Sequence, residues 1–371
     1  MKILHLTNWY PDENNPHRAK WIYNQIKTLN KYYNYDIYHI EVRFGRFEFI
    51  KRFGNIHINT LKLFIPIKNW FLIEILSGIL LLYIIIKSRA SKSYDVINFH
   101  IAYPLCTYLF LIKYFIKIPI IITEHWSAYH FKFNIKSENK LKRIKRIFNL
   151  GIPIIAVSNS LVNDIVKISK TKQNSYVLPN VVDTKIYKNL KIKKKQLSFF
   201  MISNWKDPKR PLLVLRAIAN LRFKYPNIRL KIGGYGPQID QINDYIYEFR
   251  LNNIICLLGE LSARNVAKEM NEAVALIHPS NYETFSVVCA ESLCCGTPVI
   301  CSNVGGLKDN INHSNGILVN TNSPDAFEEA IIQYIDNIST FRNNEISEKS
   351  KQKYSDHTVG NLYNEIIQCL I

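Results

Sequence analysis

Glycine and proline are scarce in this chain, which has 13 and 14 of them among 371 residues. That scarcity excludes a collagen-like or low-complexity protein. The seven cysteines follow no C-x-x-C spacing, and free core thiols in a reducing cytoplasm explain them more simply than a metal site does. The opening sequence MKILHLTNWYP has no long apolar run of the kind found in secretory leaders, so we expect it to begin a first strand.

An uninterrupted apolar run long enough to span a membrane is also missing. Trp70–Ile86 comes nearest, but Glu74 lies near its start and Ser77 and Gly78 interrupt it. A spanning helix needs about 20 apolar residues. We therefore favour a buried helix here, ahead of a helix lying on the bilayer, and a span is the least favoured interpretation.

Acidic residues are scarce in the first half of the chain. Residues 1–200 hold 32 Lys and Arg against 11 Asp and Glu, whereas residues 201–371 hold 16 against 18. This asymmetry predicts an anionic partner for the first half, such as a nucleic acid, a membrane surface or an anionic substrate. Lys132–Arg146 adds a basic amphipathic segment, a pattern that fits an anionic lipid surface and equally fits a solvated basic face.

Short apolar runs alternate with amphipathic helical patterns along the whole chain, which predicts an α/β fold with parallel sheets covered by helices. Ten strands are too many for one ordinary doubly wound sheet, so we expect two domains, residues 1–173 and 174–353. The predicted strands are Lys2–Leu6, Asp36–Val42, Asp95–Phe99, Pro119–Thr123, Ile152–Val157, Leu197–Ile202, Arg229–Ile232, Ile254–Leu258, Ala273–His278 and Pro298–Cys301.

The sharpest local signal is a pair of glutamates, Glu283 and Glu291, eight positions apart. They follow the strand Ala273–His278 and lead into a helix that Thr284 or Ser286 can cap. Glu291 would then accept hydrogen bonds from ribose hydroxyls and Glu283 would bind sugar hydroxyls. Two unrelated surface carboxylates would give the same spacing.

The start of this helix predicts a phosphate site. Unpaired backbone N–H groups in a first helical turn attract anions, and the helix dipole adds to the attraction. The amides expected to face phosphate are those of Phe285, Ser286 and Val287.

Several blocks together resemble glycosyltransferase family 4. Glu283 to Glu291 resembles its E-x7-E motif, Gly296-Thr297-Pro298-Val299-Ile300 its G-x-P-V-I strand entry, and Leu178–Asp183 its P-N-G-V-D segment, with Val181 in place of glycine. Ser302–Leu307 and Gly316–Val319 match two further blocks. The resemblance implies a GT-B fold, in which two doubly wound Rossmann-like domains face each other across a cleft and the C-terminal helix, here 354–371, packs back on the first domain.

The first domain matches this family less strongly. His125 follows the strand Pro119–Ile122 where the family carries an active-site histidine, and it is expected at the donor sugar. His100 ends the preceding strand and is the second candidate, since open α/β sheets bind ligands at the carboxyl ends of their strands. The first loop lacks the glycine pair of many members, so Arg18 is expected to offer charge to an anionic acceptor instead.

The block that contacts the diphosphate in the family is altered here. Asn204 stands where an arginine is expected, and Arg210 falls at the lysine position with Lys209 beside it. A diphosphate needs cationic partners, and Arg210 is preferred because arginine suits bidentate contact. Lys209 is the alternative, and Asn204 a weaker third. The resemblance also places Gly236 and Leu261 in loops that line the nucleotide site.

The resemblance therefore implies a retaining glycosyltransferase that takes a nucleoside diphosphate sugar as donor and requires no metal; no D-x-D pair occurs in the sequence. The basic first half suggests a lipid-linked or surface-polysaccharide acceptor and a cytoplasmic protein held peripherally on the inner face of the plasma membrane. A nucleotide-sugar epimerase with the same fold is the alternative. A nucleic-acid-binding protein is a weaker one, because no recognisable RNA or helix-turn-helix motif accompanies the charge.

Overall fold

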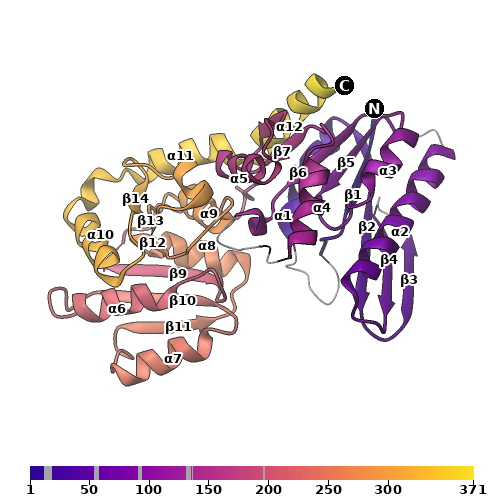
Figure 1. Cartoon of the computed structure of the whole chain (residues 1–371). Helices are drawn as coiled ribbons and strands as arrows, with labels where there is room; N and C mark the ends of the chain where they lie inside the picture. Colours follow the sequence, from indigo (N-terminus) through magenta and orange to yellow (C-terminus); the bar gives the residue numbers. More distant parts are fainter. Residues whose placement is uncertain (12–18, 54–57, 91–93, 131–134, 136, 195–196) are drawn as a thin grey trace. The chain divides into compact units, whose positions relative to one another are not determined.

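The computed structural model describes residues 1–11, 19–53, 58–90, 94–130, 135, 137–194 and 197–371 (Figure 1). The chain forms two compact units, Met1–Asn180 with Val359–Ile371, and Val181–Thr358. The sequence placed the division after residue 173. It falls after residue 180 because β8 (Ser175–Val177) pairs with β7 (Ile154–Ala156) in the first sheet.

The first unit contains an eight-stranded sheet in the order β3-β4-β2-β1-β5-β6-β7-β8. Every neighbouring pair is parallel except β3 and β4, which form an antiparallel edge. The central strands β1 and β5 are buried on both faces, as expected of parallel strands covered by helices. The remaining bounds are β1 Lys2–Thr7, β2 Asn34–Phe44, β3 Glu48–Phe53, β4 Ile58–Ile65, β5 Val96–His100 and β6 Ile120–Glu124.

The helices of the first unit are α1 (Lys20–Lys27), α2 (Trp70–Ala90), α3 (Leu109–Ile112), α4 (Glu138–Phe148), α5 (Asn159–Ser169) and α12 (Asp356–Leu370), with 3₁₀ turns η1 (Thr28–Lys31), η2 (Lys113–Phe115) and η3 (Ser127–Tyr129). The last helix packs within this unit through Gly360, which lies against Thr28, and through Tyr363, whose hydroxyl accepts from the Asn98 side-chain amide. The sequence started this return at residue 354, but the carbonyl of Tyr354 still accepts from Val182 N–H (2.9 Å) within the second unit.

Helix α2 is only partly buried, which corrects the preference for a buried helix. By length and composition Trp70–Ser88 could cross a membrane, and 39% of this stretch lies inside the fold. Its inward face carries Ile73, Leu81 and Ile84, whereas Phe71 and Ile79 on the outward face are exposed.

The second unit is a six-stranded parallel sheet in the order β11-β10-β9-β12-β13-β14 (Figure 1). Phe199, Met201 and Ile277 on its central strands pack against helical residues such as Val214 and Ile331 to form one apolar core. The strands are β9 Ser198–Asn204, β10 Arg229–Tyr235, β11 Ile255–Gly259, β12 Ala275–His278, β13 Val299–Ser302 and β14 Gly316–Val319; the helices are α6 Pro211–Leu221, α7 Ile239–Glu248, α8 Ala263–Glu272, α9 Val287–Cys294, α10 Pro324–Asp336 and α11 Asn343–Tyr354, with 3₁₀ turns η5 (Gly305–Asp309) and η6 (Ile338–Thr340).

All ten predicted strands are present, so the α/β prediction with parallel sheets is confirmed. The seven cysteines are free thiols, and five of them are buried. Among the described residues, no group of three His, Cys, Asp or Glu side chains is arranged to hold a metal ion.

Candidate functional site

The start of helix α9 is the centre of the candidate site in the second unit. Ser286 occupies the N-cap position with φ 65°, and its side chain does not cap the helix. Its Oγ lies instead 3.2 Å from His278 Nε2 and 3.2 Å from Cys289 Sγ. The expected side-chain cap is therefore wrong. The first-turn amides, from Val287 onward, have no side-chain acceptor from the cap residue and are available to an anion.

The first residue of α9 also changes which backbone amides can face phosphate. Those of Phe285, Ser286 and Val287 were expected. Because α9 begins at Val287, the Phe285 amide precedes the first turn. The Phe285 ring is buried and packs edge-on against Tyr354, with 5.7 Å between ring centroids. Thr284 precedes the N-cap and is partly exposed.

Glu283 is held as a carboxylate by two neighbours. Lys209 Nζ forms an ion pair with its Oε1, and His278 Nε2 lies 2.8 Å from the same oxygen. Burial alone would raise the pKa of Glu283, but the Lys209 ammonium and the His278 hydrogen bond lower it to about 2. His278 ends a buried strand, and no local pattern indicates that its side chain reaches Glu283.

Lys209, and not Arg210, is the cation that forms the ion pair with Glu283. Arg210 is exposed, and its Nε and Nη2 both lie 2.7 Å from the Asn281 amide oxygen, once that amide is oriented to satisfy its neighbours. Lys209 therefore contacts the glutamate directly, whereas Arg210, the preferred diphosphate ligand, is directed to Asn281.

Two glycines bring a second loop close behind Glu283. Gly306 N–H donates to the Glu283 carbonyl at 2.8 Å. Gly305 has φ 50°, and a Cβ at this position would lie 1.8 Å from the same carbonyl oxygen. Only glycine fits this approach, which explains the glycine at position 305.

Glu291, one turn into α9, has Tyr187 as its partner. Burial, together with the charge of Glu291 and a hydrogen bond to it, raises the pKa of Tyr187 well above its usual range. Tyr187 N–H donates to the Asp183 carbonyl at 2.8 Å, so the segment after Asn180 directs this ring to Glu291. Tyr187 was not predicted, since no local pattern marks it.

Asn204, Gly236 and Leu261 lie at the carboxyl ends of β9, β10 and β11. A Cβ on Gly236, where φ is 135°, would lie 2.8 Å from Asn204 Oδ1, and a Cβ on Gly233 would lie 3.0 Å from Leu261 Cδ1. The structure thus brings these three predicted residues to one edge of the sheet, the edge at which α/β sheets bind ligands.

In the first unit, three buried histidines lie on adjacent strands. His5 Nδ1 is 3.0 Å from His100 Nε2, and the His100 and His125 rings stack with centroids 6.3 Å apart. Burial lowers the pKa of His5 and of His125 to about 3, and that of His100 well below its usual value. All three are therefore neutral at physiological pH and can exchange hydrogen bonds with a hydroxyl. His5 was not predicted, because it lies inside an ordinary apolar strand.

Glu124 supports the turn that follows His100. Its Oε1 accepts from Ala102 N–H at 2.7 Å and from Tyr129 Oη at 2.8 Å. Ile101, which lies between His100 and Ala102, has φ 64°, a strained conformation for a β-branched residue. Burial raises the pKa of Glu124 to about 7, although these hydrogen bonds oppose the rise.

Two predicted features fall wholly or partly outside the described residues. Arg18 is one, and the first part of the basic segment Lys132–Arg146 is the other. Its second part forms α4, as the pattern predicted.

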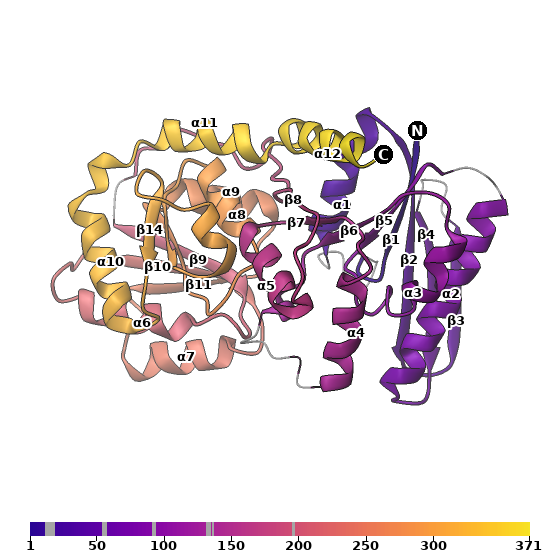
Figure 2. The ribbon, with the colours of Figure 1, turned by 45° about the horizontal axis from the view of Figure 1, so that its top comes forward.

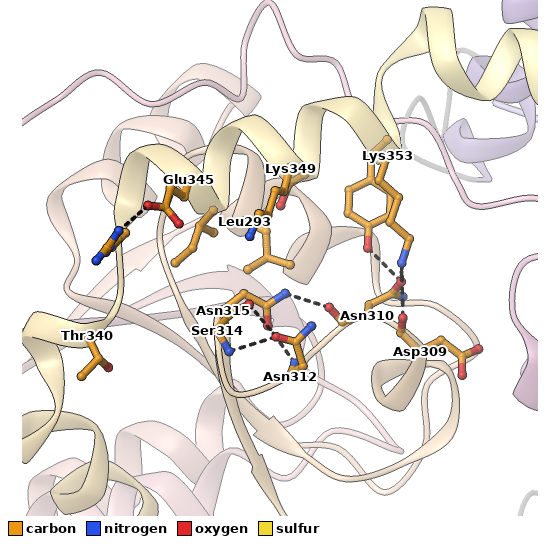
Figure 3. Close-up of a pocket in the computed structure, with 14 residues that line it drawn as sticks. Leu293, Asp309, Asn310, Asn312, Ser314, Asn315, Thr340, Glu345, Lys349 and Lys353 are labelled. Atoms are coloured by element: carbon orange, nitrogen blue, oxygen red, sulfur yellow. Dashed lines mark hydrogen bonds and ion pairs between the residues drawn. The ribbon is translucent and has the colours of Figure 1, made fainter.

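A separate polar pocket of about 280 Å³ lies between α11 and the loop from η5 to β14 (Figure 3). Its side chains bond mainly to one another: Lys353 Nζ and Tyr354 Oη both bind Asn310 Oδ1, at 2.9 and 2.8 Å. Neither glutamate of the pair lines it, so it is distinct from the site at α9.

The comparisons with known proteins agree with this geometry. Residues 182–353 match the family described as glycosyl transferases group 1, and residues 42–186 match glycosyltransferase family 4. An uncharacterized glycosyltransferase of Methanocaldococcus jannaschii is 28% identical over 260 residues, 67% of each chain. The N-acetyl-alpha-D-glucosaminyl L-malate synthase of Bacillus anthracis is 25% identical over 264 residues, 68% of each chain. A second M. jannaschii glycosyltransferase is matched over only 39% of its length.

Solved structures show the same fold over the full chain. HepE of Anabaena, crystallised with UDP, superposes with a TM-score of 0.76 at 16% identity, with both chains covered completely. The lipopolysaccharide outer core galactosyltransferase WaaB gives a TM-score of 0.75 at 19% identity, again over both complete chains. These identities establish the architecture alone.

Proposed function

This chain is a member of glycosyltransferase family 4 with the GT-B fold, and from that premise we propose that it transfers a sugar from a nucleoside diphosphate sugar to an acceptor hydroxyl with retained anomeric configuration. The observation that carries the proposal is the arrangement around α9, where free first-turn amides, Lys209 and Glu283 meet. Amides and an ammonium favour a diphosphate, and a carboxylate beside them favours sugar hydroxyls.

The second unit would bind the donor. The amides from Val287 onward and Lys209 would stabilise the negative charge that grows on the diphosphate as its bond to the anomeric carbon breaks. Because these groups supply the positive field, the proposed reaction needs no metal. Glu283, anchored by His278, would hold the sugar, and Glu291, anchored by Tyr187, would hold the ribose.

The first unit would complete the reaction. His125 is neutral, so it can accept a hydrogen bond from a sugar hydroxyl or donate one to it without competing for the diphosphate as a cation would. The acceptor oxygen would bond to the anomeric carbon on the face that the diphosphate leaves, and its proton would pass to the departing phosphate oxygen. That geometry retains the configuration.

We further propose a lipid-linked acceptor that is a precursor of a surface polysaccharide, used by a cytoplasmic protein at the inner face of the membrane. The excess of Lys and Arg in residues 1–200 supports this location. The fold shared with a lipopolysaccharide core galactosyltransferase is consistent with such an acceptor.

A donor panel tests the reaction. UDP- and GDP-sugars would be incubated with the protein, with and without membrane lipid extract as acceptor source, and released diphosphate and sugar products would be separated. The proposal expects acceptor-dependent diphosphate release and a product with the donor's anomeric configuration by NMR. An epimerised sugar formed without acceptor would instead support the epimerase, and a product of opposite configuration would overturn retention.

A further inference from the structure

A hydrophobic surface on the first unit has no partner within the described fold. On α2, Trp70 is 68% exposed, and Phe71, Ile79, Leu82, Tyr83 and Ile86 are exposed too. At about 3.6 residues per turn, Phe71, Ile79, Leu82, Tyr83 and Ile86 share one outward face and form a stripe along the helix, whereas Trp70 lies off that face at the first position of the helix. Leu111 and Tyr114, on α3 and the turn after it, are exposed nearby, where the ring of Tyr108 packs against Gly78 of α2.

The stripe continues into the loops at the N-terminal end of α2. Phe44 at the end of β2, Phe47 in the β2–β3 turn and Phe49 at the start of β3 are exposed, and so is Ile67 in the β4–α2 loop. Strand register pairs Phe44 with Ile65 and Glu48 with Phe64, so both loops lie at the same end of the sheet. We call these four residues, with Trp70, the aromatic tip.

The charge beside this surface is mostly positive, with one exposed acid, Glu48, between Phe47 and Phe49 at the tip. Arg143 of α4 lies over the Phe71 ring, 5.4 Å from its centroid, and Arg146 lies 4.6 Å from the centroid of Phe110. Figures 1 and 2 show α2, α3 and α4 along the same side of the sheet. Lys87 and Lys142 on these helices are exposed, as are Arg43, Arg46 and Lys68 at the tip.

The one acid in α2 is turned away from this surface. Glu74 is buried, where it pairs with Arg143 and accepts from the Tyr103 hydroxyl. An apolar stripe that ends in aromatic residues and is flanked by cations is complementary to the interface of an anionic bilayer. Burial of Glu74 leaves α2 without an exposed carboxylate to oppose such contact.

From this juxtaposition we infer that the α2 stripe and the aromatic tip dock on an anionic lipid bilayer. The inference rests on the membrane location proposed above, and it adds which surface of the protein contacts the membrane. Phe44 and Ile65 end β2 and β4 at the carboxyl edge where His100 ends β5. Register places His100 level with His39 of β2, two strands away or about 10 Å, and Phe44 lies five residues or about 17 Å farther along β2. A lipid-anchored acceptor would therefore have to reach about 20 Å from the tip to the histidines.

Trp70 provides a direct probe of this docking. It is the exposed one of five tryptophans, all of them within the described residues. Vesicles of phosphatidylcholine with an equal part of phosphatidylglycerol would be prepared with and without brominated acyl chains. We expect brominated lipid to quench part of the fluorescence, and Trp70→Phe to remove that part while vesicle binding persists. Quenching that is unchanged in Trp70→Phe would overturn the assigned surface.

Flotation with the same vesicles, without donor or acceptor, measures affinity. We expect binding at least about tenfold tighter than to phosphatidylcholine alone, since each basic residue near an anionic surface contributes about 1 kcal/mol. Phe47→Ser with Trp70→Ser, and Ile79→Asp separately, should each weaken binding about tenfold. Phe223→Ser, which alters a phenylalanine of the second unit that is 78% exposed, should not.

The outcomes separate this inference from the proposed function. Vesicle binding that survives the stripe and tip variants would leave the membrane location standing but overturn the surface. Absence of vesicle binding would overturn both, as would a concentration-dependent dimer that Ile79→Asp dissociates. Nucleotide binding by the same samples would show that the protein is folded and would test the donor site independently.

Discussion

His278 Nε2 lies 2.8 Å from Oε1 of Glu283, and both groups are withdrawn from solvent at the end of β12. Lys209 Nζ contacts the same oxygen. The Glu283 carboxylate, which the sequence predicted as a sugar ligand, is thus oriented by both His278 and Lys209. His278 acts through Glu283 and is a positioning residue.

The first prediction concerns that orientation. His278→Ala should lower kcat at least about tenfold while the affinity for free diphosphate changes less than threefold, because the anion-binding amides and Lys209 remain. Steady-state kinetics and calorimetry of the same variant measure the two quantities. His313→Ala, at an exposed histidine, is the matched control. Equal loss in both quantities would show that His278 only maintains the fold.

The second prediction separates two adjacent cations. Lys209→Met should weaken diphosphate binding more than about tenfold, which is about 1.4 kcal/mol for loss of a buried charge partner. Arg210→Ala should weaken it less than threefold, since its guanidinium is directed to Asn281. Titration calorimetry decides the matter, and the reverse order would restore Arg210 as the phosphate ligand.

The third prediction uses two glycines with similar backbone conformation. Gly305 has φ 50° and Gly259 has φ 65°, but a Cβ would collide with the Glu283 carbonyl at Gly305 and meet nothing within 4 Å at Gly259. Gly259→Ala should therefore cost only the left-handed conformation, about 1 kcal/mol. Gly305→Ala should cost at least about 1 kcal/mol more and weaken diphosphate binding. Urea unfolding of both variants measures the difference, and equal costs would contradict the steric explanation.

The fourth prediction is a pH dependence from Glu124. Burial raises its pKa to about 7, above the 4.5 of an ordinary glutamate. Protonated Glu124 therefore stabilises the fold below about pH 4.5, and this contribution is lost as the pH rises to about 7. The shift corresponds to roughly 3 kcal/mol in total. Glu124→Gln should remove this loss.

Urea unfolding of wild type and Glu124→Gln at pH 5 and pH 8 measures the effect. The variant should gain stability relative to wild type on going from pH 5 to pH 8. A stability difference that does not change between these pH values would mean that Glu124 stays ionised throughout.

The sequence predicted the parallel sheets covered by helices and, within the site, the two glutamates Glu283 and Glu291. Strands such as β1 and β13 are short apolar runs, and parallel pairing follows from the helices between them. The antiparallel pair β3 and β4 was missed because the apolar residues of both strands are interspersed with Lys51, Arg52 and Lys62, so no continuous run marks them.

The supporting residues could not be predicted, because long-range contacts define them. His5 and His278 look like ordinary strand residues, and their partners come from another strand and from a loop. Tyr187 meets Glu291 more than 100 residues away along the chain. The side chain of Ser286 was expected to cap α9, but the left-handed backbone at this position turns it toward His278.

Calorimetric titration with UDP and with GDP tests the central claim, that the second unit binds a nucleoside diphosphate through the α9 site. We predict saturable binding of one of them, weakened at least about tenfold in Glu291→Gln. Glu345→Gln, at a glutamate that lines the separate pocket beneath α11, should leave it unchanged. No binding of either nucleotide, or equal binding by wild type and Glu291→Gln, would contradict the account.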